Sequence, residues 1–553
     1  TICHWGSSFS SKIGLCLNLR DLPWYVQANP NAFFPRCYNL CTEDEKQDFL
    51  DDFRQTVASS ILKWVVSNHT CGKSKQKTRK EGHAASWEEK KRKCLPGRLI
   101  DAACQVCETY LGRLEHRDID GAADGPEGPD GPVSLSEPQW AELIEQYYCL
   151  IHDDAFICNS RDYIPQCQTI LNKITSVNPQ LEIDGMQSIW IIKPGAKSRG
   201  RDIVCMDRVE DILKLVSSAD QASSKDKWVV QKYIETPLLI YDTKFDIRQW
   251  FLVTDWNPLT VWFYKESYLR FSTQRFSLDS LDSSIHLCNN SVQKHLVNAA
   301  DRSPQLPAYN MWTSTRFREY LQRKGRGGVW QAVIYPAMKK AVGHALKVAQ
   351  DHVEPRRNSF ELYGADFILG KDFRPWLIEI NSSPTMLPST PVTAQLCAQV
   401  QEDTVRVVID RKLDRNCDIG NFELLWKQVR RRGRPGETPP PGPPGPRHAA
   451  CDSLFFLMVF VKVLIYARHC TERWGTTKLI GLATAPVPHG AHSLNRPFTE
   501  EGTEAQRSEV TCPASHSRRA AELGLEPGAV RLPGSGRSRS AALLLTWPSV
   551  NIG

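Results

Sequence analysis

Residues 363–386 read YGADFILGKDFRPWLIEINSSPTM, and this stretch predicts two strands joined by a short connection. The connecting segment GKDFRP is rich in Gly, Asp and Pro, which favour tight turns. Asp366 lies on the first strand, and Glu379 and Asn381 lie two residues apart on the second, so both project from the same face of that strand. Two carboxylates and an amide oxygen that converge across a hairpin are hard-oxygen ligands of the kind that Mg²⁺ accepts.

Apolar side chains of the second strand flank these acids, namely Trp376, Ile378 and Ile380. Burying two acids in such surroundings without a cation is costly. The alternative is that the acids are exposed at the end of the hairpin. The sequence favours a metal site formed by Asp366 and Glu379 together with the amide.

Two upstream stretches could bind a nucleotide. WIIKPGAKSRGRDIV (190–204) is an apolar strand that ends at Lys193, followed by a loop with Gly195 and Gly200. A lysine and loop amides in this position can contact a polyphosphate, although no G-K-[ST] opens a helix as in a P-loop. KWVVQKYIETPLLI (227–240) offers backbone donors, acceptors and apolar faces that suit a purine. The alternatives are a strand that ends in a basic turn and an edge strand with mixed faces.

TKFDIRQWFLV is an alternating strand with charges at every second position. Lys244, Asp246 and Arg248 are expected on one face, and Phe245 and Ile247 on the other. Three charges in such an apolar neighbourhood indicate a functional face, and a solvated edge is the alternative.

The chain divides by composition into three regions. Residues 1–133 form an N-terminal region with a basic insert at 72–94, which holds nine cations and three acids, and a Gly/Pro/Asp linker at 118–133. Residues 134–428 alternate strand-like and helical patterns, which predicts an α+β domain with a mostly antiparallel sheet. Residues 429–553 are rich in Pro and Arg, and we predict a disordered tail.

The net charge of +7 arises entirely from the C-terminal region. From residue 430 onward there are 16 Lys and Arg against 9 Asp and Glu, which leaves 69 − 16 = 53 cations and 62 − 9 = 53 anions before it. Bulk charge therefore gives no reason to expect a nucleic-acid partner, and local patches must attract any acidic substrate. The insert at 72–94 is a candidate patch, with a solvated loop as its alternative.

The remaining signals concern the redox state of the cysteines and any targeting or membrane segment. The 18 cysteines show no disulfide framework, so we expect reduced thiols in the cytosol. No signal peptide is visible at the start of the chain. The apolar run from Leu454 to Ala467 contains Lys462 and is shorter than the roughly 20 residues of a membrane span, so no membrane insertion is expected.

Taken in order, these elements resemble the ATP-grasp ligases, and specifically the tubulin–tyrosine ligase-like family. KPGAKSRGRDI, QKYI, KFDIRQW, HLCNNS and EINSSPTM carry the resemblance over residues 185–390. The N-terminal SKIGLCLNLRDLPWY and FFPRCYNL are similar to the initiating, glycine-adding branch, the tubulin monoglycylases. The resemblance implies an α+β ATP-grasp fold with mostly antiparallel sheets and flanking helices, and it implies ATP and Mg²⁺ as cofactors.

The resemblance also implies roles for individual residues. The phosphates of ATP would be held by Lys193, Arg199 and Gly200, with Arg199 also near the protein acceptor. The adenine would be lined by Gln231, Lys232, Tyr233 and Ile234. The rest of the nucleotide, including its ribose, would be bound by Lys244, Phe245 and Asp246, with Cys288 and Asn289 beside it. The catalytic cations would be Lys193, Arg199, Lys244 and Arg248.

Further implied roles concern the substrates and the metal. Ser291 would lie beside the incoming amino acid, and Arg248 and Arg270 would pair with carboxylates of the amino acid or acceptor. Asp366, Glu379 and Asn381 would hold Mg²⁺. The sequence departs from the family pattern at Asp202, where relatives commonly show glycine. HLCNNS also lacks the usual threonine, so Cys288 would contribute through its backbone.

The implied activity is ATP-dependent addition of glycine to glutamate side chains in acidic tubulin tails, through an acyl phosphate. Two alternatives stay open. One is a polyglutamylase of the same fold, and the other is a non-catalytic microtubule-binding protein. The partners would be tubulin tails, microtubules and free glycine, and the expected location is the cytoplasm, cytoskeleton and ciliary or flagellar axoneme.

Overall fold

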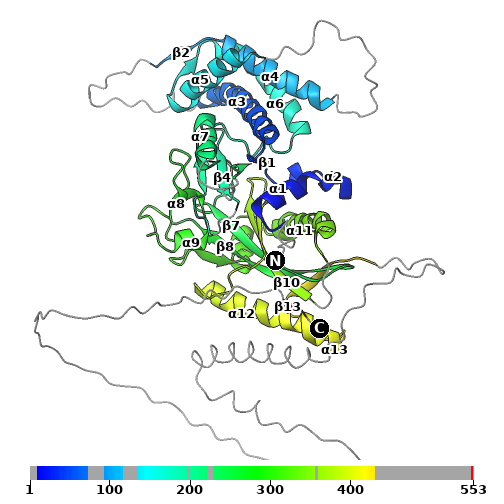
Figure 1. Ribbon diagram of the computed structural model, residues 1–553. Coiled ribbons are helices and arrows are strands. Elements are labelled where there is room, and N and C mark those ends of the chain that lie inside the picture. Colours follow the sequence, from blue (N-terminus) through cyan, green and yellow to red (C-terminus); the bar gives the residue numbers. More distant parts are fainter. Residues whose placement is uncertain are drawn as a thin grey trace, which may run out of the picture. The chain divides into compact units, whose positions relative to one another are not determined.

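The computed structural model describes residues 9–72, 92–115, 135–195, 199–220, 228–354, 359–429 and 550–551. Within these ranges the chain forms a large antiparallel sheet, a smaller antiparallel sheet and a set of helices that covers them (Figure 1). The expected α+β fold with mostly antiparallel sheets is confirmed. No described helix is long and apolar enough to span a membrane.

The large sheet has the strand order β11-β10-β7-β8-β12, with β9 added beside β8 and β13 beside β10. All of its pairings are antiparallel. Its strands are β7 (Phe245–Trp256), β8 (Leu259–Phe271), β9 (Met311–Thr313), β10 (Ser359–Leu369), β11 (Pro375–Asn381), β12 (Phe422–Lys427) and β13 (Val550–Asn551).

Both faces of the large sheet carry apolar side chains, so each face is covered by helices. One face, with Phe251 and Phe263, packs against α1 (Lys12–Arg20) and α11 (Tyr335–Ala349). The other face, with Trp250 and Tyr264, packs against α12 (Pro391–Val405). Figure 1 shows α11 and α12 on opposite sides of β7, β8 and β10.

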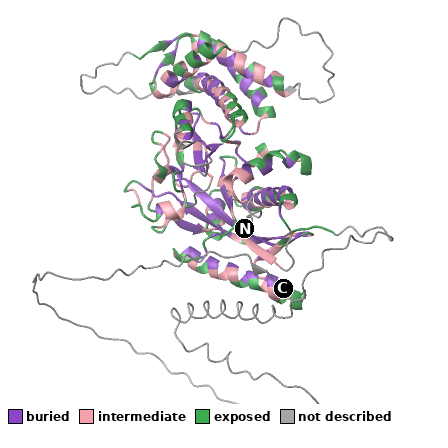
Figure 2. Cartoon of the chain, in the orientation of Figure 1, coloured by how far each residue is buried: buried purple, intermediate pink, exposed green. Residues whose placement is uncertain are grey.

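The smaller sheet has the order β1-β6-β4-β5, all antiparallel. Its strands are β1 (Cys37–Asn39), β4 (Trp190–Pro194), β5 (Val204–Met206) and β6 (Trp228–Lys232). Trp190, Ile192 and Val230 point to a helical layer on one face. That layer is formed by α3 (Glu43–Gly72), α4 (Arg98–Glu115), α5 (Glu137–His152), α6 (Ile164–Val177) and α7 (Val209–Asp220). The strands of both sheets are largely buried, and exposed positions gather on the helices (Figure 2).

The shorter elements connect these layers. The helical ones are α2 (Leu22–Tyr25), α8 (Ser283–His286), α9 (Asn290–Gln293), α10 (Ser314–Arg323) and α13 (Arg411–Leu413). The 3₁₀ and π turns are η2 (Pro30–Ala32), η4 (Ser160–Tyr163), η5 (Trp330–Ile334), η6 (Gln350–His352) and η7 (Arg406–Asp410). A two-stranded parallel sheet joins β2 (Cys94–Leu95) to β3 (Phe156–Ile157).

The N-terminal segment is part of both sheets. Strand β1 pairs with β6, with Cys37 opposite Gln231. Phe9 packs in the core of the large sheet against Trp256 and Tyr363. The segment over 9–39, which composition places in a separate N-terminal region, therefore completes the two sheets that carry the candidate site.

Several predicted regions fall outside the described residues. These are most of the basic insert 72–94, the linker 118–133, the apolar run 454–467 and the tail 429–553 apart from residue 429 and β13.

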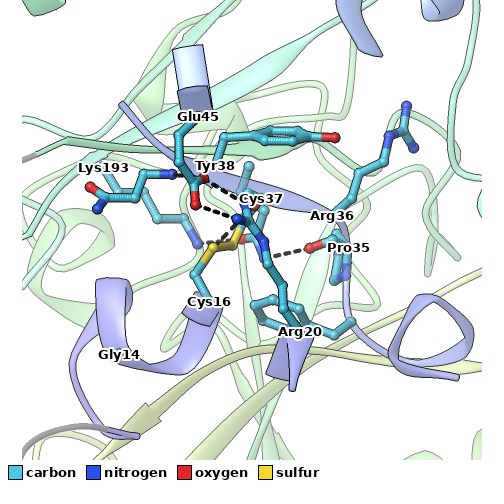
Figure 3. The surroundings of a disulfide bond; sticks show 12 residues. Gly14, Cys16, Arg20, Pro35, Arg36, Cys37, Tyr38, Glu45 and Lys193 are labelled. Atoms are coloured by element: carbon cyan, nitrogen blue, oxygen red, sulfur yellow. Dashed lines mark hydrogen bonds and ion pairs between the residues drawn. A yellow bond between two sulfur atoms is a disulfide. The ribbon is translucent and has the colours of Figure 1, made fainter. Parts of the chain in front are cut away.

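The structure corrects the expectation of reduced thiols for four cysteines. Cys16 is bonded to Cys37 and Cys94 to Cys158, with Cα atoms 6.0 and 6.2 Å apart. Both pairs are far apart in sequence and meet only because the fold places α1 beside β1 and β2 beside β3. Nine further cysteines whose side chains the structure describes are free. Figure 3 shows the Cys16–Cys37 bond with Arg20, Glu45 and Lys193 around it.

Candidate active site

The hairpin β10–β11 brings the three predicted metal ligands together. Asp366 and Glu379 are direct cross-strand partners, so their side chains share one face. The Asn381 amide nitrogen donates to Glu379 Oε1 at 3.2 Å and lies 3.5 Å from Asp366 Oδ2. The predicted turn between the strands forms over 370–374, where Gly370 N–H donates to the Arg374 carbonyl at 2.9 Å.

The two carboxyls of this hairpin differ in their electrostatics. Burial and the neighbouring Asp366 raise the pKa of Glu379. Burial also acts to raise the pKa of Asp366, but the charges of Arg248 and Arg270 outweigh it and hold that pKa well below its usual range. Asp366 is therefore a compensated anion, whereas Glu379 forms no ion pair within the described residues.

A charged network surrounds Asp366 on the face predicted from alternation. Arg248 binds both oxygens of Asp366, one of them at 3.0 Å. Arg270 binds Asp246 at 2.6 and 2.8 Å and reaches Asp366 at 2.9 Å. Phe245 and Ile247 lie in the apolar core on the opposite face, as expected. In this arrangement both arginines act as partners of the protein's own acids.

Lys193 faces these acids from the smaller sheet. Its side chain is only 5% exposed, and Nζ donates to Gln231 Oε1 at 2.7 Å. Burial lowers its pKa to about 8, and the charge of Glu379 opposes that shift. The described residues offer Lys193 no ion pair. A buried ammonium held by a neutral amide can accept a polyphosphate without first breaking an ion pair.

The loop after Lys193 is held in an unusual backbone conformation. Arg199 and Gly200 have φ of 65° and 74°, in the left-handed region that favours glycine. A β-carbon at Gly200 would approach Val292 Cγ2 to 3.0 Å, and Ser291 Oγ donates to the Arg199 carbonyl at 2.8 Å. The HLCNNS segment therefore fixes the course of this loop.

Lys244 has two neutral partners. Nζ donates to Tyr233 Oη and to the His286 carbonyl, both at 2.8 Å, and burial lowers its pKa. Tyr233 Oη in turn lies 2.7 Å from His286 Nδ1. Burial, with a smaller effect of Lys244, lowers the pKa of His286 to about 4, so this imidazole is neutral at physiological pH.

The strand predicted to line the adenine is supported by a buried ion pair. Lys232 Nζ binds Glu235 Oε1 at 2.7 Å, and both side chains are inaccessible to solvent. Glu235 also accepts from the backbone of Gln187 and Ile189, each at 2.9 Å. The Lys232 side chain is therefore occupied by its ion pair with Glu235. The backbone of the strand and Ile234 are left for the predicted contact with adenine.

Cys288 and Asn289 precede Ser291 in the HLCNNS segment. The Cys288 thiol is buried, and burial raises its pKa to about 12, so it stays protonated. The Asn289 carbonyl accepts from Val292 and Gln293 at the start of α9. A buried, protonated thiol is compatible with the predicted backbone role of Cys288. The roles of all these residues remain predictions.

Sequence reasoning missed three residues around the site, namely Lys12, Glu235 and His286. Lys12 Nζ donates to the Pro194 carbonyl at 3.2 Å, and its pKa is lowered by burial, which the charge of Glu379 opposes. A usable signal existed for Lys12. Ser11 caps α1 by accepting from Gly14 N–H, so Lys12 is the first helical residue, where the helix dipole disfavours a cation.

The donor set fits a hard cation. Across the described ranges, no group of three or more His, Cys, Asp and Glu side chains is placed to hold a metal. The hairpin set contains only two such side chains, and its third donor is the Asn381 amide. Two carboxyls, of which Glu379 has a raised pKa, and one amide oxygen suit Mg²⁺. This ion retains water and phosphate oxygens as its other ligands.

Comparison with known proteins agrees with this geometry. Residues 142–417 match the Tubulin-tyrosine ligase family. The protein monoglycylase TTLL8 of Homo sapiens is 67% identical over 447 residues, or 79% of this chain and 51% of that protein. The tubulin monoglycylase TTLL3 of Mus musculus is 51% identical over 426 residues, 76% of this chain and 45% of that protein.

A more distant relative shows the same coverage. The tubulin glycylase 3A of Drosophila melanogaster is 39% identical over 427 residues, 76% of this chain and 41% of that protein. The chain thus spans about half the length of the curated relatives that it matches. The family match covers both sheets of the site except β1, β12 and β13, and it includes Lys193, Asp366, Glu379 and Asn381. The chain belongs to the tubulin-tyrosine ligase family.

Proposed function

We propose that the protein is an ATP-dependent ligase that adds glycine to glutamate side chains of tubulin tails. The observation that carries the proposal is the convergence of Asp366, Glu379 and Asn381 on one face of the hairpin, with Glu379 near enough for its charge to act on Lys193 of the other sheet. The names of the relatives, protein monoglycylase and tubulin monoglycylase, support the choice of reaction.

The chemistry requires positioned charge. In the first step the acceptor carboxylate attacks the γ-phosphorus of ATP, and ADP leaves. The glycine amine then attacks the acyl carbon, phosphate leaves, and a proton is lost from nitrogen to give the amide. Such phosphoryl transfer depends on positioning and charge neutralisation rather than on a protein nucleophile.

The residues of this chain supply those functions. The Lys193 ammonium, protonated at neutral pH with a pKa of about 8, would bind phosphate oxygens, and Arg199 would add charge from the loop. Lys244 would contribute a second buried cation beside Tyr233. Asp366, Glu379 and Asn381 would hold Mg²⁺, which neutralises phosphate charge when bound.

The arginine network favours glycine over glutamate as the added amino acid. A glutamate substrate brings a side-chain carboxylate that needs its own cation. Arg248 and Arg270 are engaged by Asp366 and Asp246. A substrate without a side chain makes no such demand on them.

The proposal includes the location and the partners. The protein would act in the cytoplasm on microtubules, including those of ciliary and flagellar axonemes. Fluorescence microscopy of the tagged protein in ciliated cells tests this location. Signal on microtubules and axonemes supports it, and signal confined to other compartments would contradict it.

The activity itself is tested with purified protein, tubulin, ATP and either radiolabelled glycine or radiolabelled glutamate. We expect label from glycine, in a bond that resists denaturation and requires ATP. Label from glutamate alone would establish the polyglutamylase alternative. Microtubule cosedimentation without any labelling would establish the non-catalytic alternative.

A further inference from the structure

We propose that the exposed face of α10 and the turn that follows it form a docking surface for the acidic flank of the acceptor peptide. This inference rests on the proposed function, because it concerns the substrate of the same site. Residues 314–326 contain five cations and one acid, whereas residues 1–429 as a whole are neutral. A local excess of this kind is what an anionic peptide would meet on an otherwise balanced surface.

The cations of this segment differ in their partners. Arg318 lies 3.3 Å from Glu266 and is compensated. The other four cations are exposed and form no ion pair in the part of the chain that the structure describes, and these are Arg316, Arg323, Lys324 and Arg326. Their charge is therefore available to a partner.

Aromatic rings hold part of this surface in place. The Arg316 guanidinium lies over the Trp312 ring at 5.0 Å, and the Lys324 ammonium over Tyr320 at 5.9 Å. Such contacts restrict the stems of long side chains while the charged groups stay in water. Ordering before binding lowers the entropy lost when a partner docks.

The helix is anchored on the large sheet, directly after β9. Its buried face packs through Phe317 on Phe245, with ring centroids 5.7 Å apart, so α10 covers the apolar face, opposite the face of the candidate site. Thr313, which caps α10, is the cross-strand partner of Tyr268.

The sheet register relates this cap to the carboxyl pair. Tyr268 is opposite Arg248, Arg248 is opposite Asp366, and Asp366 is opposite Glu379. Cross-strand partners share a face, so Thr313 and Glu379 belong to one row that crosses four strand spacings, roughly 19 Å. An extended peptide covers that distance in about six residues. Arg323 lies ten residues beyond Thr313, at most roughly 15 Å further along the helix. A tail of about ten extended residues with its reacting glutamate beside Glu379 could therefore place acidic neighbours on the cations of α10.

The surface is tested by binding and by kinetics with the triple variant R323E/K324E/R326E. Its matched control is R161E/K173E/K214E, which makes the same charge change at exposed cations of η4, α6 and α7. The probe is a fluorescent glutamate-rich peptide of twelve residues, and anisotropy gives its Kd without turnover. We expect the α10 variant to raise Kd and the KM for the peptide at least 30-fold, with the KM for ATP unchanged.

The outcomes separate this proposal from the proposed function. Wild-type affinity in the α10 variant, or an equal loss in the control, would overturn the surface while glycine labelling could persist. Loss of peptide binding in the variant alone supports the surface even if no glycine is ever incorporated. Thermal melting establishes that the variant is folded, and R323K/R326K should retain binding. Tighter binding of a twelve-nucleotide RNA than of the peptide at this face would also overturn the proposal.

Discussion

The aspartate–arginine network of the large sheet and Lys193 of the smaller sheet hold their buried charges in opposite ways. On the large sheet, Asp246, Arg248, Arg270 and Asp366 neutralise one another through short contacts. On the smaller sheet, Lys193 is buried, and within the described ranges its hydrogen-bond partner is the neutral Gln231 amide. The network needs no ligand to balance its charges, whereas a buried charge without an ion pair is costly and persists where a ligand supplies the opposite charge.

Glu379 belongs with Lys193 in this comparison, although it lies on the large sheet. Its pKa is raised and that of Lys193 is lowered, so burial pushes both groups toward neutrality. A polyphosphate with a divalent cation carries the charges that would complement both. Perturbed pKa values of this kind are a feature of functional sites.

The largest effect is expected for Glu379→Gln. Loss of this carboxylate should reduce glycine incorporation at least 1,000-fold, because the cation site would lose one of its two charges. Thermal stability should be unchanged or higher, because a buried acid with a raised pKa becomes neutral. The control is Glu423→Gln, which removes an acid of the same sheet that is paired with Lys339. Equal activity in the two variants would remove the metal site from the proposal.

A loss of stability is expected for Arg270→Met. The substitution leaves Asp246 buried with no cation bound to it and removes one of the two that Asp366 has, which should lower the free energy of unfolding by about 3 kcal/mol. Urea denaturation measures the change. Arg275→Met, an exposed cation of the adjoining loop, is the control and should change stability by less than about 0.5 kcal/mol. A stable Arg270→Met protein would show that the network is not structural.

A pH dependence of about tenfold per unit is expected for ATP binding above pH 8. The Lys193 pKa is about 8 rather than 10.5, so the free enzyme loses this ammonium as pH rises through 8. The pKa values of the nearby Lys12 and Lys244 are also lowered, and their titration would act in the same direction. Calorimetric titration with ATP from pH 7 to 9.5 measures the slope.

Lys193→Arg provides the matched control for that slope. Arginine keeps its charge throughout this range. The affinity of this variant for ATP should therefore fall less steeply with pH than that of the wild type, even if it is lower overall. A wild-type affinity that is constant up to pH 9.5 would contradict the assignment of Lys193 to the phosphates.

The smallest effect is expected for Lys12→Ala. Lys12 reaches Pro194, the residue after Lys193, from a helix that belongs to the N-terminal segment. Its loss should raise the KM for ATP about fivefold with little change in kcat, because it supports the phosphate loop and adds charge near Glu379. Lys46→Ala on the exposed side of α3 is the control. An unchanged KM for ATP would restrict Lys12 to a structural role.

Sequence reasoning succeeded where the signal is local. The hairpin 363–386 carries its own turn and alternation, so the convergence of Asp366, Glu379 and Asn381 followed from spacing alone. The face shared by Asp246 and Arg248 was likewise predicted by the two-residue period.

It failed where distant segments decide the outcome. No local pattern indicates that Lys232 turns to Glu235 behind the strand, or that Arg270 bridges two aspartates. The bonded pair Cys16–Cys37 is also invisible in the spacing of the cysteines. These features depend on tertiary packing, which neither composition nor periodicity specifies.

The pairing of β1 with β6 has a consequence for biosynthesis. Cys37 and Gln231 are partners separated by 231 − 37 = 194 residues, so the first strand emerges from the ribosome long before its neighbour exists. Until then Phe9, Leu15 and Leu19 have no core to enter, and exposed apolar segments of nascent chains invite aggregation. Chaperone dependence during translation should therefore be concentrated around residues 9–39, and expression of the catalytic region without them should yield insoluble protein.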